Sequence, residues 1–415
     1  MPMVKYKIKT LSNISSKGLM ALSQSSCSID DDCKDPDGIL IRSTKLEKTY
    51  LNNNLKAISR AGAGFNNIPI DACSEKGIVV FNTPGANANA VKELVLAGLM
   101  LSSRNVFSSI DFVNNLEHFK NMKDLEPFLE ENKKRFKGRE LSGSTLGVVG
   151  LGAIGSKVAR MGVALDMKVV GYDPALSVEA AWRLPSQVEP ADSIEDLFSV
   201  ADFISLHIPA NDKTKGIIDS KLLDKASKAS LLNFARHEVV DEKAVLRALD
   251  KDSLSNFITD FPTPELIKRA NNGGDVILLP HIGASTSQAE ENCAIMAVDQ
   301  ITEFLQSGNI TNSVNFPNVH LDMTTDYRIA ITNKNVPAVI GKIASTLGRL
   351  GLNISDMTPS IVNQIELAKT LFKKKNKIFG SCWGLQVLTT AAGGLIRKNP
   401  NGLEAIVSKL SLIHI

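Results

Sequence analysis

The chain has 415 residues, of which 43% are hydrophobic and 22% are charged, proportions that exclude a disordered or collagen-like protein and predict several folded domains. Lys and Arg number 47 against 44 Asp and Glu, so the net charge of +3 favours no nucleic-acid partner. The best apolar run, Leu94 to Leu101, is far shorter than the roughly 20 residues of a membrane span. Five scattered cysteines without metal-ligand spacing and a polar N-terminus favour a cytoplasmic protein with reduced thiols, no membrane contact and no metal site.

Short apolar runs alternate with helical stretches over the first hundred residues, which predicts a parallel sheet covered by helices. The predicted strands are Lys7–Leu11, Gly38–Ile41, Leu55–Arg60 and Gly77–Phe81. The predicted helices cover Ile70–Lys76 and Ala88 to about Ser102. A polar stretch rich in Lys and Glu between Asp111 and Glu140 is expected to be a hinge region before a second domain.

The alternation becomes regular from Thr145 onward, as in a doubly wound dinucleotide-binding domain. The predicted strands are Leu146–Val149, Met167–Gly171, Phe203–His207, Ala229–Phe234, Asn256–Thr259 and Val276–Leu279. Helices are predicted at Ile154–Leu165, Ser193–Phe198 and Asp241–Leu249. A long helix from Ser285 to about Leu305 follows, and residues 327–358 then show a short strand–helix–strand pattern with its helix at Ala338–Leu350.

Three glycines, Gly150, Gly152 and Gly155, follow the apolar run LGVV and open a predicted helix. Such glycines allow a tight turn, close approach of a pyrophosphate, and close packing of helix on strand. Asp173 ends the next predicted strand, where a carboxylate accepts hydrogen bonds from ribose hydroxyls and repels a 2′-phosphate. The spacing therefore predicts NAD as the cofactor in preference to NADP.

Polar residues stand at the carboxyl ends of the predicted strands, the edge at which open parallel sheets bind ligands. The strand ends are occupied by Gly150 and by five polar residues: Asp173, His207, Arg236, Asp260 and His281. Hydride transfer involving a 2-oxo acid needs a cation for the carboxylate, a general acid–base, and a carboxylate that orients it. Arg236, His281 and Glu265 can supply these roles, whereas His207 is also explained as a strand cap.

Several segments resemble the NAD-dependent D-2-hydroxyacid dehydrogenases: LGVVGLGAIGSKVA, LLNFARHEVVDEKAVLRAL, ITDFPTPEL and LLPHIGAST. Two others, RAGAGFNNIPID and VFNTPGANANAVKE, resemble the phosphoglycerate dehydrogenases within that family. The resemblance implies two Rossmann-like doubly wound α/β domains, with a substrate domain (1–101 and 286–314) interrupted by an NAD-binding domain (102–285). The sequence departs from the family pattern at two places. His237 stands where glycine is common, and DFPTPEL replaces the usual segment around Glu265.

The resemblance also implies functional residues. It gives catalytic roles to Arg236, Glu265 and His281. The cofactor-binding set is Gly150, Gly152, Ala153, Ile154, Gly155, Asp173, Phe234, Ala235, Asp260 and Gly283. Arg42 and Arg60, which follow strands of the first domain, suit a substrate phosphate, and the turn at Asn87 could add backbone donors.

The expected activity is oxidation of 3-phospho-D-glycerate to 3-phosphohydroxypyruvate by NAD, which opens L-serine biosynthesis. One alternative is another D-2-hydroxyacid dehydrogenase, such as a hydroxypyruvate or glyoxylate reductase. A second is a non-catalytic NAD-binding protein on the same fold, which the intact Arg236, Glu265 and His281 disfavour. The family resemblance implies a homodimer or larger homo-oligomer.

The C-terminal part resembles pieces of two other families. Residues 318–358 resemble the first half of an ACT domain, with Asn335 and Asn353 where such domains contact an amino-acid effector. Residues 360–415 resemble a fragment of a class I glutamine amidotransferase, whose nucleophile elbow would place Cys382 at a helix N-terminus. A thiol nucleophile also needs a base and a carboxylate, which that family carries well beyond the elbow. We therefore expect no separate chemistry from this part.

Overall fold

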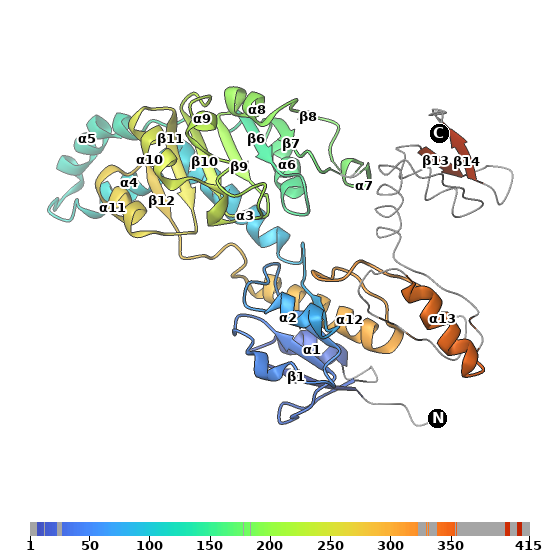
Figure 1. Cartoon of the computed structure of the whole chain (residues 1–415). Coiled ribbons are helices and arrows are strands. Elements are labelled where there is room, and N and C mark those ends of the chain that lie inside the picture. Colours follow the sequence, from blue (N-terminus) through green and yellow to red (C-terminus); the bar gives the residue numbers. More distant parts are fainter. Residues whose placement is uncertain are drawn as a thin grey trace. The chain divides into compact units, whose positions relative to one another are not determined.

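The computed structural model divides into two compact units, Met1–Thr83 with Ala294–Ile415, and Pro84–Cys293 (Figure 1). It describes residues 6–11, 13–22, 27–176, 178–182, 184–322, 329, 331, 338–352, 354, 395–398 and 405–408. The second unit starts before helix α3 (Ala88–Arg104), because this helix packs on α6 (Gly155–Ala164) and on strands of the same unit. The domain boundaries expected at residues 101 and 285 stay predictions.

The first unit is built on a five-stranded parallel sheet in the order β2-β1-β3-β4-β5. Its strands are β1 (Tyr6–Thr10), β2 (Cys27–Ile29), β3 (Gly38–Ile41), β4 (Ala57–Arg60) and β5 (Val79–Phe81). Its helices include α1 (Ser16–Leu22), α2 (Ile70–Glu75) and most of α12 (Ser287–Ser307). The four strands and the helix predicted at Ile70–Lys76 are confirmed, and β2 adds an edge strand of three residues.

The second unit holds a seven-stranded parallel sheet in the order β12-β11-β10-β9-β6-β7-β8. The strands are β6 (Thr145–Val149), β7 (Lys168–Tyr172), β8 (Val188–Pro190), β9 (Phe203–Leu206), β10 (Ala229–Asn233), β11 (Leu254–Thr259) and β12 (Val276–Leu278). The chain order reverses between β6 and β9, which is the topological switch point of a doubly wound fold. The six predicted strands are therefore confirmed, and β8 is an additional edge strand.

Both faces of this sheet are buried, as expected for parallel strands covered by helices. Every residue of β9 and β10 is buried, including the polar Ser205 and Asn233. The helices around the sheet are α6, α7 (Val178–Ala181), α8 (Ile194–Val200), α9 (Ser220–Leu223), α10 (Glu242–Asp250), α11 (Pro264–Gly273) and the 3₁₀ turn η3 (His237–Val239). One hydrophobic cluster contains Leu197, Phe198 and Leu231, and a second contains Val95, Leu146 and Phe234.

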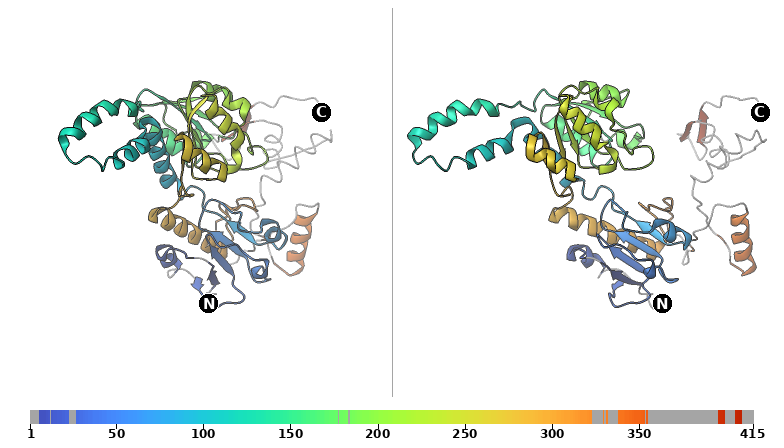
Figure 2. Two further views of the ribbon diagram at one scale, coloured as in Figure 1. Left: turned by 90° about the vertical axis from the view of Figure 1, so that its left-hand side faces the viewer. Right: turned by 60° about the vertical axis from the view of Figure 1, so that its left-hand side comes forward.

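The segment expected to be a polar hinge is helical instead, and that expectation was wrong. It forms α4 (Val106–Asn114), α5 (Met122–Asn132) and a 3₁₀ turn η2 (Lys133–Phe136), which extend away from the sheet of their unit (Figure 2). Phe112 stacks on Phe128 at 5.8 Å between ring centroids and lies 5.1 Å from Phe136. A small aromatic cluster thus holds this helical arm together, although many of its residues are charged.

The described C-terminal elements are α13 (Val339–Arg349) and an antiparallel pair, β13 (Leu395–Lys398) and β14 (Ala405–Ser408). The helix predicted at Ala338–Leu350 is confirmed by α13. Asn335, Asn353 and Cys382, together with most of the strand expected at Tyr327–Thr332, lie outside the described residues. The ACT-like and amidotransferase-like assignments therefore stay predictions.

Candidate active site

The glycine-rich turn joins β6 to α6, and its three glycines have different surroundings. Gly150 has φ +90°, and an added Cβ would lie 2.6 Å from the carbonyl oxygen of His207. At Gly155 an added Cβ would lie 1.8 Å from the carbonyl oxygen of Gly150, so only glycine lets the helix start this close to the strand. A Cβ at Gly152 would meet nothing within 4 Å, which leaves space for a ligand. This cradle, at the N-terminus of α6, fits a pyrophosphate.

Asp173 follows β7 and is held by two backbone groups. Its Oδ2 accepts a hydrogen bond from the N–H of Leu151 at 2.9 Å, and its Oδ1 accepts one from Ala175 at 2.9 Å. Each oxygen keeps a second acceptor position, so the fixed carboxylate can still receive ribose hydroxyls. The carboxylate therefore anchors the glycine-rich turn, and its role toward the cofactor stays a prediction.

The remaining turn residues, Ala153 and Ile154, are exposed and half-buried, respectively. The loop before α3 lies beside them, because a Cβ on Gly85 would be 2.9 Å from the Cβ of Ala153. Asn87 precedes α3, and its buried Oδ1 has no hydrogen-bond partner in the described structure. The N-terminus of α3 and the glycine-rich turn therefore form neighbouring walls of one site.

Asp260 and His281 come together at the ends of β11 and β12. The N–H of His281 donates to the carbonyl oxygen of Asp260 at 2.9 Å, and the N–H of Gly283 donates to Asp260 Oδ2 at 2.9 Å. Burial raises the pKa of the Asp260 carboxyl, while the Gly283 hydrogen bond and the charges of His281 and Arg236 work against that rise. The three candidate groups therefore interact electrostatically, with the exposed His281 ring 5.1 Å from the ring of Phe261.

Arg236 lies in the turn after β10 and is half-buried. Its Nη1 donates to the carbonyl oxygen of Ala235 at 2.6 Å. Asn233 shapes this turn, because its Nδ2 donates to the carbonyl oxygen of Arg236 at 2.9 Å and its Oδ1 accepts from Ala235 at 3.1 Å. The side chain of Phe234 instead packs in the hydrophobic core, so a cofactor could meet only its backbone.

Sequence reasoning missed two buried polar residues that support this edge, Asn233 and Thr259. The Thr259 hydroxyl donates to the carbonyl oxygen of Asn233 at 2.9 Å and accepts from the N–H of Phe261 at 3.2 Å. This pair connects the turns that carry Arg236 and Asp260. The sequence did carry a signal for both residues, because each is a polar residue at the end of a mainly apolar strand.

Glu265 lies in the first turn of α11 and is exposed. Within the described chain it makes no hydrogen bond or ion pair with His281, so its proposed role in orienting the imidazole stays a prediction. His237 is also largely exposed, and its Nδ1 lies 3.3 Å from Glu238 Oε2. The bulky ring after the arginine is therefore accommodated at the surface beside a carboxylate.

His207 belongs to the same edge but is neutral. Its Nε2 lies 2.8 Å from the Ser205 hydroxyl, and its Nδ1 is buried without a hydrogen-bond partner. Burial lowers the pKa of its imidazole to about 3. The backbone N–H of His207 donates to the carbonyl oxygen of Val149 at 2.7 Å, so the residue supports the glycine-rich turn as a strand cap would.

The two arginines expected to bind phosphate lie at one edge of the first unit's sheet. Arg60 ends β4 in register with Ile41, which directly precedes Arg42. Arg60 Nη1 donates to the carbonyl oxygen of Gly64 at 2.7 Å, which holds the guanidinium over its own glycine loop. Both side chains are half-buried, so each keeps an exposed part for a ligand.

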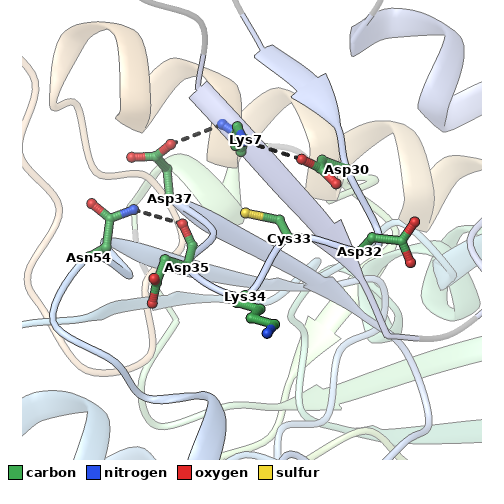
Figure 3. A pocket seen from close by; sticks show the side chains of 8 residues that line it. All are labelled: Lys7, Asp30, Asp32, Cys33, Lys34, Asp35, Asp37 and Asn54. Carbon is green, nitrogen blue, oxygen red and sulfur yellow. Dashed lines mark hydrogen bonds and ion pairs between the residues drawn. The ribbon is translucent and has the colours of Figure 1, made fainter.

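A hollow of about 670 Å³ lies elsewhere in the first unit, lined by Lys7, Asp30, Asp32, Cys33, Lys34, Asp35, Asp37 and Asn54 (Figure 3). Three of its charged residues are partners of one another: Lys7 Nζ lies 3.3 Å from Asp30, and Asp37 accepts the backbone N–H of Lys7 at 2.9 Å. It contains none of the predicted site residues.

Among the described residues, no three His, Cys, Asp or Glu side chains gather as possible metal ligands. None of the helices described is both long enough and apolar enough to cross a membrane.

Comparison with known proteins agrees with this geometry. Residues 108–283 match the model of the D-isomer specific 2-hydroxyacid dehydrogenase, NAD binding domain. The chain is 34% identical over 343 residues to D-3-phosphoglycerate dehydrogenase of Methanocaldococcus jannaschii, covering 80% of this chain and 60% of the relative. It is 35% identical over 274 residues to hydroxypyruvate reductase of Thermotoga maritima, covering 64% of this chain and 83% of the relative.

A solved structure of NAD⁺-bound 3-phosphoglycerate dehydrogenase of Entamoeba histolytica matches with a TM-score of 0.59 and 29% identity, over 75% of this chain and 99% of that one. The chain spans only 51 to 60% of the length of the phosphoglycerate dehydrogenases that it matches first. Sequence, fold and glycine cradle agree: the chain belongs to the D-isomer specific 2-hydroxyacid dehydrogenase family and contains its NAD-binding domain.

Proposed function

We propose that the protein oxidises 3-phospho-D-glycerate to 3-phosphohydroxypyruvate with NAD, the entry reaction of L-serine biosynthesis. The observation that carries the catalytic part is the hydrogen bonding of Asp260 to the N–H groups of His281 and Gly283, at the carboxyl edge of the seven-stranded sheet that also carries Arg236. The substrate assignment is supported by the several phosphoglycerate dehydrogenases among the relatives.

Each side chain has a distinct task in this proposal. The Arg236 guanidinium binds the substrate carboxylate and polarises the adjacent C–O bond. The His281 imidazole takes the proton of the C2 hydroxyl as the C2–H bond breaks, and returns it in the reverse direction. NAD, when bound, accepts the hydride from C2. Asp260 holds the backbone of His281 and Gly283, so it positions the imidazole without touching the substrate.

Recognition of the substrate phosphate is assigned to Arg60 and, with a smaller share, to Arg42. Guanidinium groups bind phosphate through two parallel hydrogen bonds, and the backbone N–H groups of the Gly62–Gly64 loop can add donors. The second candidate function is reduction of hydroxypyruvate, which is favoured by the similarity to the Thermotoga maritima enzyme.

NADH formation with a panel of D-2-hydroxy acids tests these alternatives. We expect 3-phosphoglycerate to give the highest kcat/KM, and Arg60→Ala to raise KM for it while unphosphorylated acids change little. Equal effects on both substrate classes would make Arg60 structural. NADH binding without turnover of any acid would instead indicate a non-catalytic NAD-binding protein.

Two further expectations belong to this proposal. The protein acts in the cytoplasm, and it forms a homodimer or a larger homo-oligomer. Support for the oligomer comes from the helical arm (residues 106–136), because Phe107, Ile110 and Val113 on α4 leave about half of their side-chain area exposed. Helix α5 carries several acidic residues, and the following turn η2 carries basic ones. In a two-fold symmetric dimer, α5 of one protomer can therefore pair with η2 of the other.

A further inference from the structure

Asn82 directly follows β5 and is buried although its side chain is polar. Its Nδ2 donates to the carbonyl oxygen of Ala63 at 2.6 Å, in the Gly62–Gly64 loop that follows β4. A buried amide is costly without a partner, so this bond fixes the direction of the side chain. Asn82 therefore links the end of one strand to a single peptide in the loop after its neighbour.

The carbonyl groups on either side of this peptide are also held by the first unit. The carbonyl oxygen of Gly62 accepts from the N–H of Thr83 at 3.1 Å, and that of Gly64 accepts from Arg60 Nη1 at 2.7 Å. A trans peptide is planar, and its N–H points to the side opposite its C=O. The N–H groups of residues 63–65 therefore face away from the three donors that hold these carbonyl groups.

These three consecutive N–H groups are open to a ligand. Among the described residues, none of them donates to an acceptor of the protein. Ala63 and Gly64 are half-buried and Phe65 is exposed, so a solute can reach this side of the loop. The Arg60 guanidinium lies against the same loop, because a Cβ on Gly62 would be 2.5 Å from its Nη1. Successive backbone N–H groups bind anions, and a guanidinium beside them favours the same ligands.

The far end of this loop has an anchor of its own. Asn67 Nδ2 donates to the carbonyl oxygen of Thr44 at 2.7 Å and to that of Arg42 at 3.2 Å, so it ties the loop to the segment after β3. Removing the amide of Asn82 would leave this anchor intact. The change would therefore release the Ala63–Gly64 peptide without detaching the rest of the loop.

We propose that Asn82 is a positioning residue for the substrate: it turns the Ala63–Gly64 peptide so that the Gly64 N–H faces an anionic group of the substrate. Asn82 acts through this peptide, because its own donor is occupied by Ala63. The inference deepens the proposed function and rests on it. The anionic group is the phosphate or the carboxylate of the substrate, since both accept hydrogen bonds from backbone N–H groups.

Two substitutions test the role of Asn82. Asn82→Ala removes the donor, and Asn82→Asp keeps the size but replaces the donor with an oxygen. The matched control is Asn315→Ala, because the Asn315 amide also bonds to backbone at β5, accepting from Val80 and donating to Ile78, each at 2.9 Å. Steady-state kinetics with 3-phosphoglycerate and with D-glycerate, NADH titration and thermal unfolding are measured for each variant.

We expect both Asn82 variants to raise KM for 3-phosphoglycerate at least about tenfold, as for loss of a hydrogen bond to a charged group. Their kcat and NADH Kd should stay within about twofold of the parent, because the chemistry and the cofactor use other residues. Asn315→Ala should lower Tm and leave KM unchanged, which separates positioning of the loop from general stability.

The outcomes also identify the anionic group. A rise in KM confined to 3-phosphoglycerate identifies the phosphate, and an equal rise with D-glycerate identifies the carboxylate. KM changes below twofold, or a joint fall of kcat, NADH affinity and Tm, would overturn the proposal. If the unmodified chain turns over neither acid, the proposed function fails, and calorimetric titration with 3-phosphoglycerate then tests Asn82. Equal Kd values for the parent and Asn82→Ala, or no binding to the parent, would overturn the role of Asn82.

Discussion

His281 has a backbone conformation that side chains rarely adopt. Its φ is +52°, and its N–H is shared between the carbonyl oxygens of Asp260 and Leu279. A non-glycine residue in this region costs of order 1–3 kcal/mol, and such strain tends to persist at functional sites. The hydrogen bond to Asp260 holds the residue there, which fixes the direction of the imidazole.

Replacing the imidazole should therefore stop the chemistry and spare the cofactor. For His281→Ala we expect kcat to fall roughly 10²–10⁴-fold, the usual contribution of a general acid–base, with little change in NADH Kd. Steady-state kinetics and a fluorescence titration check this prediction. A loss smaller than tenfold would remove His281 from the catalytic role.

The carboxylate that assists His281 can be identified from pH–rate profiles. If Glu265 pairs with the imidazolium during turnover, Glu265→Gln lowers the apparent pKa of the histidine. Asp260→Asn removes the charge that already interacts with His281 in the structure. If the pH–rate profile shifts in Asp260→Asn but not in Glu265→Gln, the electrostatic role belongs to Asp260 and not to Glu265.

Asp173 should determine cofactor choice. Its carboxylate repels a 2′-phosphate, so Asp173→Ala is expected to weaken NAD binding and to relax discrimination against NADP. The substitution also releases the N–H of Leu151, and therefore Asp173→Asn, which can still accept from it, serves as the control. Equal use of NAD and NADP by the unmodified protein would contradict the prediction.

His207 makes the folded state sensitive to acid. Its pKa in the folded protein is about 3, below the usual value of about 6.5, so the unfolded chain takes up this proton first. Above pH 6.5 the ring is neutral in both the folded and the unfolded state, so it does not change the free energy of unfolding. Between pH 6.5 and 3 the protein loses up to about 1.4 kcal/mol per pH unit from this group. Urea unfolding at several pH values should show a smaller acid loss in His207→Gln than in the parent.

At the scale of elements, helix α4 of the arm leaves part of an apolar face uncovered by the residues that the structure describes. Phe107, Ile110 and Val113 repeat every third residue along α4 and are about half exposed. For Ile110→Glu we expect the dimer Kd to rise more than tenfold, because a charge would be buried in the interface. Light scattering after size-exclusion chromatography measures this. Val200→Glu, on the exposed face of α8, is the control and should leave the mass unchanged.

The elements that the sequence predicts best are those whose signal is local. The central strands β9 and β10 of the second unit are buried along their whole length, and the glycines after β6 act through neighbouring backbone atoms. The sequence does not predict the edge strands β2 (CSI) and β8 (VEP), because a polar residue interrupts each and neither forms an apolar run. The arm was misread because charged residues outnumber its few aromatic contacts. The contact of Asp260 with His281 joins two separate strands, so residue types suggested it but spacing could not establish its geometry.

At the scale of the whole molecule, the described C-terminal elements add little to the two cores. α13 buries none of its residues, and β13 and β14 pair only with each other. The linker that precedes these elements, in contrast, is held by hydrogen bonds. Val319 exchanges backbone hydrogen bonds with Ile310, and the N–H of Leu321 donates to Asn309 at 3.0 Å. A deletion that tests the dehydrogenase part should therefore begin after Asp322, so that these contacts remain.

Removing residues 323–415 should leave kcat/KM within about threefold of the full chain and change Tm only slightly, because no described core residue is lost. A deletion starting after Pro317 breaks the pairing with Ile310 and is expected to be less stable, which makes it a matched comparison. The full chain should release no ammonia from glutamine. Glutamine hydrolysis that Cys382→Ala abolishes, or loss of turnover in the deletion after Asp322, would show that the C-terminal part has a function of its own.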